Sequence, residues 1–257
     1  MPNSFFSWVF FLLDKYGALF LQGAGVTLLI AVVGTVMGFF IGLGVAIVRT
    51  MQLSTQASRL RRILLSISKW LMGAYIEIFR GTPMIVQAMV VYYGALEYLG
   101  LDIPALGAAF LVVSVNTGAY MAEILRGGIL SVDRGQKEAA TAIGMTHWQM
   151  MTGVILPQAV RNTLPSVGNE FVVNIKDSSV LNVISVTELY FMSKSAAGTY
   201  WKYFEVFFIT SVIYFVLTFT ITRLLRLLEK KLSGSDSYTI YGSQSHSKAE
   251  IKINQPG

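Results

Sequence analysis

The sequence predicts an all-α membrane protein, and two observations predict it: the composition and the length of the apolar segments. Of the 257 residues, 54% are hydrophobic and 13% are charged, whereas an ordinary soluble domain has about 45–50% and about 25%. The uncharged run of residues 19–48 exceeds the roughly 20 residues that a helix needs to cross a hydrocarbon core. We expect five transmembrane helices, with the N-terminus outside and the C-terminus in the cytoplasm.

The first expected span is residues 19–48, and residues 1–18 before it are expected to form an external segment. Gly34, Gly38 and Gly42 are four residues apart in this span, so in a helix they share one face. Small residues in such a register let two backbones approach closely. We therefore expect this face to pack against another helix.

Three more segments are expected to cross the membrane. Residues 66–96 are long enough, but the charges in their first half place the embedded part from about Trp70 onward. A kink is expected near Pro83, because proline has no N–H for the helical hydrogen bond. The uncharged runs 103–122 and 206–222 give two further spans, and two aromatic residues lengthen the second of them.

Residues 156–187 are the least regular of the expected spans. In a bilayer, an interrupted helix is tolerated only where it is buried in protein or lines a water-filled cavity. We therefore expect a broken or partly unwound helix buried among the others. The segment contains prolines and ionisable residues, among them Pro157, Pro165, Glu170, Lys176 and Asp177.

The basic residues decide the expected orientation, because they gather in alternate connections between the spans. By the positive-inside rule those connections are cytoplasmic. The pI near 9.5 therefore reflects membrane topology, and no nucleic-acid partner is expected. The cytoplasmic set comprises Arg49, Arg59, Arg61, Arg62, Lys69, Arg126, Arg134, Lys137, Arg161, Arg223, Arg226, Lys230 and Lys231.

The chain divides into three expected parts. An external segment at 1–18 precedes a membrane domain at 19–232, which includes a cytoplasmic loop at 133–157. Residues 233–257 are rich in Ser, Lys, Gln and Gly and have no apolar period. We expect them to form a flexible cytoplasmic tail.

Several classes of chemistry are not expected. The chain has no cysteine and two histidines, so neither a thiolate nucleophile nor a histidine-based metal centre is expected. Ser178 and Ser179 have no nearby histidine to act as a base, so no catalytic residue is expected. No G-x-x-x-x-G-K-[ST] segment is present, so ATP and Mg would be bound by a partner, and no cofactor by this chain.

The loop 133–157 has a pattern of two short helices. Lys137 to Ile143 favours a helix that Gly144 ends. A second short helix contains Trp148, and the chain re-enters the membrane at Pro157. Composition alone is equally consistent with a purely structural connection.

Residues 138–157 read E-A-A-x-x-x-G-x(9)-V-x-L-P. This pattern resembles the signature loop of membrane permease subunits of binding-protein-dependent ABC importers, with Val154 where the family has isoleucine. In that family the loop forms coupling helices that sit in a cleft of the cytoplasmic ATPase. The resemblance implies a type I importer fold, and it implies that the ATPase is coupled through Gly135, Glu138, Ala139, Ala140, Gly144, Leu156 and Pro157.

Three further blocks are similar to the polar amino acid subgroup of these permeases, and the resemblance covers residues 27–228. It implies an importer in the bacterial cytoplasmic membrane that moves a polar amino acid by alternating access. Glutamine, glutamate or aspartate, and basic amino acids all remain open. The blocks are Glu77 to Pro83 with Gln87, Ala119 to Ile129, and Lys176 to Leu181, where Ser178 and Val180 replace the usual threonine and leucine.

The resemblance also implies partners: cytoplasmic ABC ATPase subunits, an external amino-acid-binding protein, the amino acid and membrane lipid. A second permease subunit, identical or similar, is expected because five helices enclose too little to form a pathway. The alternative is a sensory or scaffold subunit that reports the state of the binding protein without transport. Ions in the fourth span favour transport, because a scaffold has no need of them in the bilayer.

Ionisable residues inside the hydrocarbon zone are by default path or site residues. Lys176 beside Asp177 offers both charges to a bound amino acid, and the alternative is a buried pair that only bridges helices. For Glu77 and Arg80, three residues apart, the alternative is a surface ion pair or a contact with a neighbour. The candidate substrate-binding residues are Lys176, Asp177, Ser178, Ser179, Asn174, Glu170, Glu77, Arg80 and Gln87.

Overall fold

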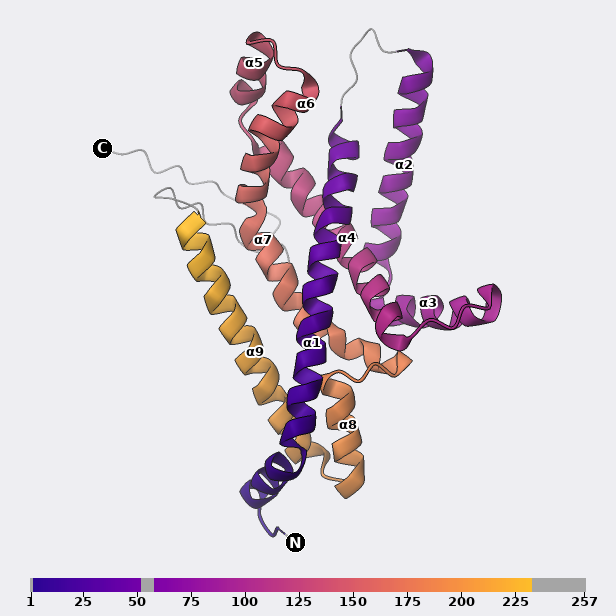
Figure 1. The fold of residues 1–257 in the computed structure, drawn as a ribbon, viewed down its shortest axis with the longest axis vertical. Coiled ribbons are helices and arrows are strands. Elements are labelled where there is room, and N and C mark those ends of the chain that lie inside the picture. The colour runs from indigo at the N-terminus through magenta and orange to yellow at the C-terminus, as the bar shows by residue number, and fades with distance from the viewer. Residues whose placement is uncertain (1, 52–57, 233–257) are drawn as a thin grey trace, which may run out of the picture.

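The structure is a computed structural model that describes residues 2–51 and 58–232. Within these residues every regular element is helical, which confirms the expected all-α class (Figure 1). The expected tail at 233–257 lies outside the described residues. The elements are α1 Phe5–Thr50, α2 Arg59–Gly81, α3 Met84–Leu99, α4 Ala105–Ser131, α5 Arg134–Ala142, α6 His147–Met150, a π-helical turn Met151–Ile155, α7 Leu156–Asp177, a 3₁₀ helix Ser178–Ile184, α8 Leu189–Tyr200 and α9 Tyr203–Leu232.

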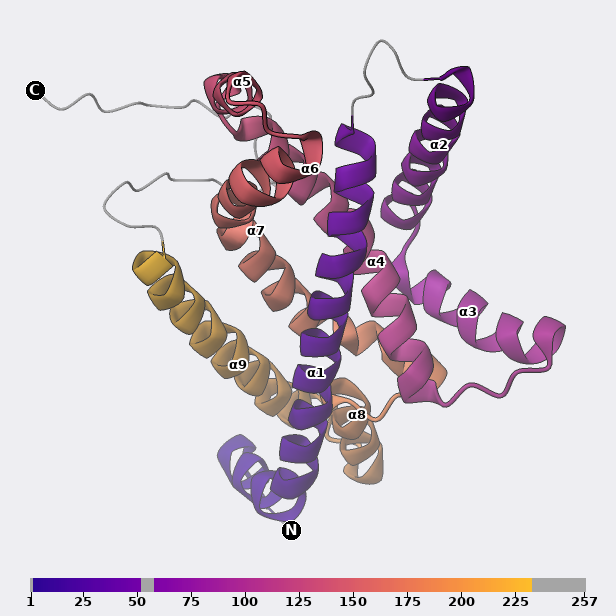
Figure 2. The ribbon, with the colours of Figure 1, turned by 45° about the horizontal axis from the view of Figure 1, so that its top comes forward.

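α1 has 46 residues, a length of about 69 Å at 1.5 Å per residue. The expected span 19–48 lies inside it, and residues 5–18 are helical and continuous with it. Figures 1 and 2 show the first turns of α1 bent away from the axis of the rest of the helix. Among the described residues, α1, α4 and α9 are long and apolar enough to cross a membrane.

The most extensive helix contact joins α1 to α4, and the three glycines in register lie in it. A Cβ added at Gly38 would be 2.8 Å from Thr117 Cβ, and one added at Gly42 would be 2.5 Å from Met121 Cβ. Gly34 faces Val113 in the same way. The predicted packing face is therefore confirmed, and its partner is α4 of the same chain.

The kink predicted near Pro83 is a complete break. α2 ends at Gly81 and α3 begins at Met84, with Thr82 and Pro83 in extended conformation between them. In Figures 1 and 2 α3 runs crosswise to α2. The segment 66–96 thus forms parts of two helices.

The irregularity predicted for residues 156–187 is confirmed, but its position differs from that of the prolines. Pro165 lies within α7 without ending it. The α-helix instead tightens into the 3₁₀ helix at Ser178, which Ser185 ends in the left-handed conformation, with φ of 63°.

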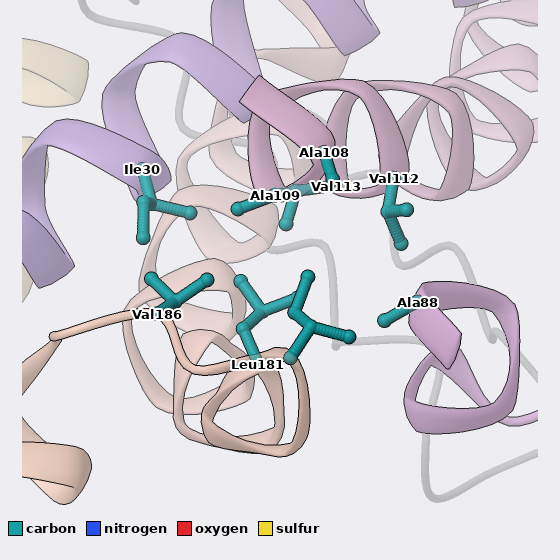
Figure 3. Close-up of a cluster of buried hydrophobic side chains, with 9 residues drawn as sticks. Ile30, Ala88, Ala108, Ala109, Val112, Val113, Leu181 and Val186 are labelled. Atoms are coloured by element: carbon teal, nitrogen blue, oxygen red, sulfur yellow. The ribbon is translucent and has the colours of Figure 1, made fainter. Parts of the chain in front are cut away.

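The 3₁₀ helix contributes to the main apolar cluster. Leu181 and the following Val186 pack against Ile30 of α1, Val113 of α4 and Ala88 of α3 (Figure 3). All five side chains are almost fully buried. This packing holds the unwound segment between three helices and excludes water from its apolar side.

The two ends of the molecule differ in character. α5 and α6 lie at one end with the start of α2, whereas α8 and the start of α1 lie at the other (Figure 1). At the second end an apolar cluster joins Trp8 and Leu12 of α1 to Leu189 of α8 and Val206 of α9. Lys202 Nζ lies 4.9 Å from the centre of the Trp8 ring there. Aromatic and lysine side chains of this kind are typical of a membrane–water interface.

Replacing Gly42 by alanine should lower the thermal unfolding midpoint of the purified protein, because the new Cβ would meet Met121 and the Ala122 nitrogen at 2.5–2.7 Å. Overpacking of this kind destabilises by about 1–3 kcal/mol. Gly44→Ala is the matched control, since a Cβ there meets nothing within 4 Å. Its midpoint should be unchanged or raised. Equal midpoints for the two variants would contradict the packing face.

Candidate functional site

A cleft of about 660 Å³ opens between the end of α2, one face of α4, and the facing parts of α7 and α9. Its walls combine small residues with charges of both signs. A cavity that offers a few polar groups of opposite sign suits a small ligand that itself carries both charges. The charged lining residues are Arg80, Glu123, Glu170, Arg226 and Glu229.

Arg80 lies in the last turn of α2, and its guanidinium carbon is 5.3 Å from the centre of the Tyr120 ring on α4. This cation–π contact orients the guanidinium in the cleft. Glu170 of α7 lines the same cleft, near enough to interact electrostatically with Arg80 and with Asp177. In the described part of the chain, neither Arg80 nor Glu170 belongs to an ion pair. Both charges are therefore available to a ligand.

Lys176 and Asp177 are exposed at the end of α7. No salt bridge of 4 Å or less joins them within residues 2–51 and 58–232. The alternative of a buried pair that bridges helices is therefore not what the structure shows. Lys176 instead lines a second cleft, of about 250 Å³, with Arg223 and Arg226 of α9.

Both polar atoms of the Asn174 amide form hydrogen bonds within the protein. Its Nδ2 donates to Thr35 Oγ1 at 2.9 Å, and its Oδ1 accepts from Thr117 Oγ1 at 3.0 Å. The side chain is buried, so it joins α7 to α1 and α4. Ser178 is also fully buried and donates to the Ile175 carbonyl at 3.0 Å. Asn174 therefore holds helices together, whereas the Ser178 hydrogen bond is local to its own stretch of the chain.

The remaining candidates divide in the same way. Gln87 is buried, and its amide is hydrogen bonded at the α2–α3 break. Glu77 is exposed but does not line the cleft, and no ion pair between Glu77 and Arg80 occurs among the described residues. Ser179 is partly buried at the start of the 3₁₀ helix. The structure thus places Arg80 and Glu170 in one cleft, whereas Lys176 lines the second cleft and Asp177 lines neither of the two.

Two site features fall in the block Ala119 to Ile129, none of whose residues was among the candidate substrate-binding residues. Tyr120 lines the cleft together with Ile124 and Gly127. Their spacing places them on one face of α4, and this face forms a wall of the cleft. Glu123 accepts hydrogen bonds from Arg126, at 2.8 Å, and from Arg49 near the end of α1. The spacing of Tyr120, Glu123 and Gly127 was the signal available in the sequence for this wall.

The loop 133–157 forms the two short helices that were predicted. The Asp133 carboxylate accepts from the Gly135 N–H at 2.7 Å and so caps α5. Gly144 has φ of 80°, a left-handed conformation that favours glycine, and it ends the first helical segment. Thr146 and Gln149 form a capping box at the start of α6.

The loop presents a surface at the end of the molecule. Glu138 is exposed and pairs with Arg134 at 3.2 Å, and Ala139 is exposed whereas Ala140 is buried. Two large apolar side chains stand free beyond them, Ile143 at 75% and Trp148 at 58% exposed. Exposed apolar residues rimmed by charge are typical of a surface that binds another protein. Leu156 and Pro157 begin α7, which continues the chain from α6 through the π-helical turn.

A helical membrane protein with a cleft of mixed charge and two short exposed helices at one end has the architecture of a transport component. Residues 57–234 match the model of the family described as the binding-protein-dependent transport system inner membrane component. This match covers more than half of the chain, and the chain belongs to this family. It is therefore a membrane permease without its own ATPase, and its family implies an ATPase and a binding protein as partners.

Two relatives are similar over most of their length. The arginine transport system permease protein ArtQ of Bacillus subtilis is 34% identical over 216 residues, which are 84% of this chain and 93% of that protein. The glutamine transport system permease protein GlnP of Escherichia coli is 33% identical over 219 residues, 83% of this chain and 93% of that protein.

Solved structures share the fold. One described as an amino acid ABC transporter with histidines has a TM-score of 0.75 and 37% identity, and the match covers 90% of this chain and 100% of that one. The inward-facing MetNI methionine ABC transporter has a TM-score of 0.72 and covers 85% of this chain and 98% of that one. Its identity is 20%, so it supports the fold alone.

Proposed function

We propose that this chain is the permease subunit of an ATP-driven importer that moves a polar amino acid across the bacterial cytoplasmic membrane. One observation carries the proposal: Arg80 and Glu170 line one cleft with opposite charges that are not in ion pairs among the described residues. An arginine can grip a carboxylate with two parallel hydrogen bonds, and a glutamate accepts from an ammonium group. The similarity to arginine and glutamine permeases supports this class of substrate.

The substrate path extends from this cleft towards α9. Lys176 lines the smaller cleft, and Arg226 lines both clefts, so the two cavities share a wall. Asp177 and Ser179 follow Lys176 at the end of α7. The amino acid would therefore leave the Arg80–Glu170 cleft past charged groups that replace its lost hydration.

Five spans support this path: α1, α2 with α3, α4, α7 and α9. The N-terminus is external and the C-terminus cytoplasmic, since the basic residues gather at the end that carries α5 and α6. The first turns of α1 then lie along the external membrane surface, where the exposed Phe6 and Phe10 contact lipid. This placement also accounts for the length of α1, which is more than twice a hydrocarbon core of about 30 Å.

A second permease subunit, identical or similar, completes the pathway. α9 leaves most of its apolar surface unburied, since 17% of its most apolar window is buried. The second cleft is lined by Lys176 of α7 and Arg223 of α9, and it opens where this unburied surface of α9 meets α7. A second subunit placed here would enclose these charges at the interface, which is where a path between two five-helix subunits belongs.

The movement that ATP hydrolysis causes in the ATPase would be transmitted to the cleft through α5 and α6. Ile143 and Trp148 insert into the partner ATPase, and the capped helices transmit its closure as one body. α6 runs through the π-helical turn into α7, which carries Glu170 and Lys176. Closure of the ATPases then moves the cleft between inward-facing and outward-facing states.

Arg80→Ala and Glu170→Gln should each reduce uptake of L-glutamine or L-arginine by roughly tenfold or more, because a hydrogen bond to a charged group contributes about 1.5–3 kcal/mol. The measurement is uptake into proteoliposomes that contain the permease, its ATPase and its binding protein. Glu77→Gln is the matched control, since Glu77 lies one turn from Arg80 and outside the cleft. Uptake at the parental rate in both cleft variants would remove them from the site.

Glu138→Arg and Gly144→Asp should detach or uncouple the ATPase while the membrane fold stays intact. The first reverses an exposed charge, and the second strains a backbone with φ of 80° at the turn between α5 and α6. Co-purification of the ATPase and stimulated ATP hydrolysis are the measurements. Lys194→Glu, an equal charge reversal on α8 at the opposite end, should leave both unchanged. Normal ATPase binding and stimulation in the two loop variants would overturn the coupling assignment.

A further inference from the structure

We infer that Gln87 and Asn116 are positioning residues for Arg80: they fix the interrupted backbone between α2 and α3 and thereby aim the Arg80 guanidinium into the cleft. The inference rests on the proposed role of Arg80 in binding the substrate. It assigns to Gln87 a task other than contact with the substrate.

The break between α2 and α3 frees backbone carbonyls inside the protein. The last four carbonyls of a helix have no partner within it, and Pro83 cannot donate a hydrogen bond because proline has no N–H. One freed carbonyl, of Ile78, accepts from Thr82 Oγ1 at 2.8 Å. The others need donors from outside the helix.

Gln87, in the first turn of α3, supplies one of those donors and also binds the residue that follows the helix. Its Nε2 donates to the Phe79 carbonyl at 3.0 Å and to the Thr82 carbonyl at 3.0 Å, one on each side of Gly81. The same atom lies 2.8 Å from Thr82 Oγ1. A single amide therefore fastens α3 to the end of α2 across the break.

Asn116 of α4 completes the network. Its Nδ2 donates to the Phe79 carbonyl at 3.1 Å and to Gln87 Oε1 at 3.0 Å. Every polar atom of the Gln87 amide is thus hydrogen bonded, and its side chain is 8% exposed and absent from the lining of the cleft. The Gln87 amide is therefore bound within the protein and is not presented to the cleft.

One face of α4 holds Arg80 at two points. Asn116 and Tyr120 are four residues apart, so they lie one turn apart on the same face. Asn116 holds the carbonyl of Phe79, the residue before Arg80, and the Tyr120 ring lies against the guanidinium. The backbone and the tip of Arg80 are therefore both fixed with respect to α4.

Removal of the amide at 87 would leave the Thr82 carbonyl without this donor and the Phe79 carbonyl with Asn116 alone, and it would release the end of α2 from α3. The helix end would then shift or fray, and the guanidinium would move with it. A displacement of about 1 Å is enough to weaken an oriented interaction strongly. The loss would appear in substrate binding although Gln87 does not touch the substrate.

The test measures binding of radiolabelled L-glutamine and L-arginine, by equilibrium dialysis, to the permease–ATPase complex in nanodiscs without binding protein. Gln87→Met keeps the side-chain volume and removes the amide, and Asn116→Ala removes the second donor independently. Each should raise the dissociation constant by roughly tenfold, the scale of one or two lost hydrogen bonds. Either variant suffices if the other does not fold, as judged by the thermal unfolding midpoint.

Tyr75→Phe is the matched structural control. It removes a hydrogen bond of 2.6 Å from Tyr75 Oη to the Val115 carbonyl, which also joins α2 to α4 but lies about two turns before the break. This variant should lower the unfolding midpoint and leave the dissociation constant unchanged. An equal loss of binding in Tyr75→Phe would show that any weakening of the α2–α4 contact has the same effect, and it would overturn the inference.

The Arg80→Ala background separates positioning from other effects. Gln87→Met should have no further effect there, because the group that it positions is gone. The same tenfold loss in both backgrounds, or no loss in the parental background, overturns the positioning role. If Arg80→Ala itself leaves binding unchanged, or if the parent binds neither amino acid, the proposed site fails.

Discussion

Inside a bilayer every backbone N–H and C=O needs a partner within the protein, and this requirement decides where a chain can interrupt its helices. The permease meets it at two places by different means. Between α2 and α3 the side chains of Gln87 and Asn116 donate to the freed Phe79 carbonyl, whereas after Asp177 the backbone tightens into a 3₁₀ helix. Among the described residues no buried side-chain nitrogen or oxygen lacks a partner. The irregular segments therefore keep a defined shape, and the first of them follows directly on Arg80, which lines the cleft.

The regular part of the fold forms the frame for these segments. α1 and α4 pack at backbone contact through Gly34, Gly38 and Gly42, and Asn174 ties α7 to both of them. The loop helices α5 and α6 are capped within the loop and stand at the end of this frame. This loop is joined directly to two helices of the frame, since α5 follows α4 after two residues and α6 continues into α7 through a single helical turn.

Local and periodic features could be predicted from the sequence. The glycine register and the helix pair around Gly144 follow from spacing within one segment, whereas the unwinding could be predicted within residues 156–187 but not placed at Ser178–Ile184. Tertiary pairings could not be predicted in this way. The hydrogen bonds of Asn174 join residues 57 and 139 positions apart, and the salt bridge of Arg49 with Glu123 spans 74 positions. A side-chain amide in a polar span can hydrogen bond equally well to a ligand or to another helix. Which of the two it does depends on its neighbours in space, and the sequence does not give them.

At some glycines an added side chain would meet no other atom, and these positions are suited to measuring the relative motion of helices. The chain has no cysteine, so a cysteine introduced at Gly44, where added atoms meet nothing within 4 Å, would be its sole thiol. Gly73 on α2 offers the same freedom at a second site. Spin or fluorescent labels at these two positions would report the distance between α1 and α2 without disturbing the packed face. The natural sequence thus already provides a nearly ready template for distance spectroscopy.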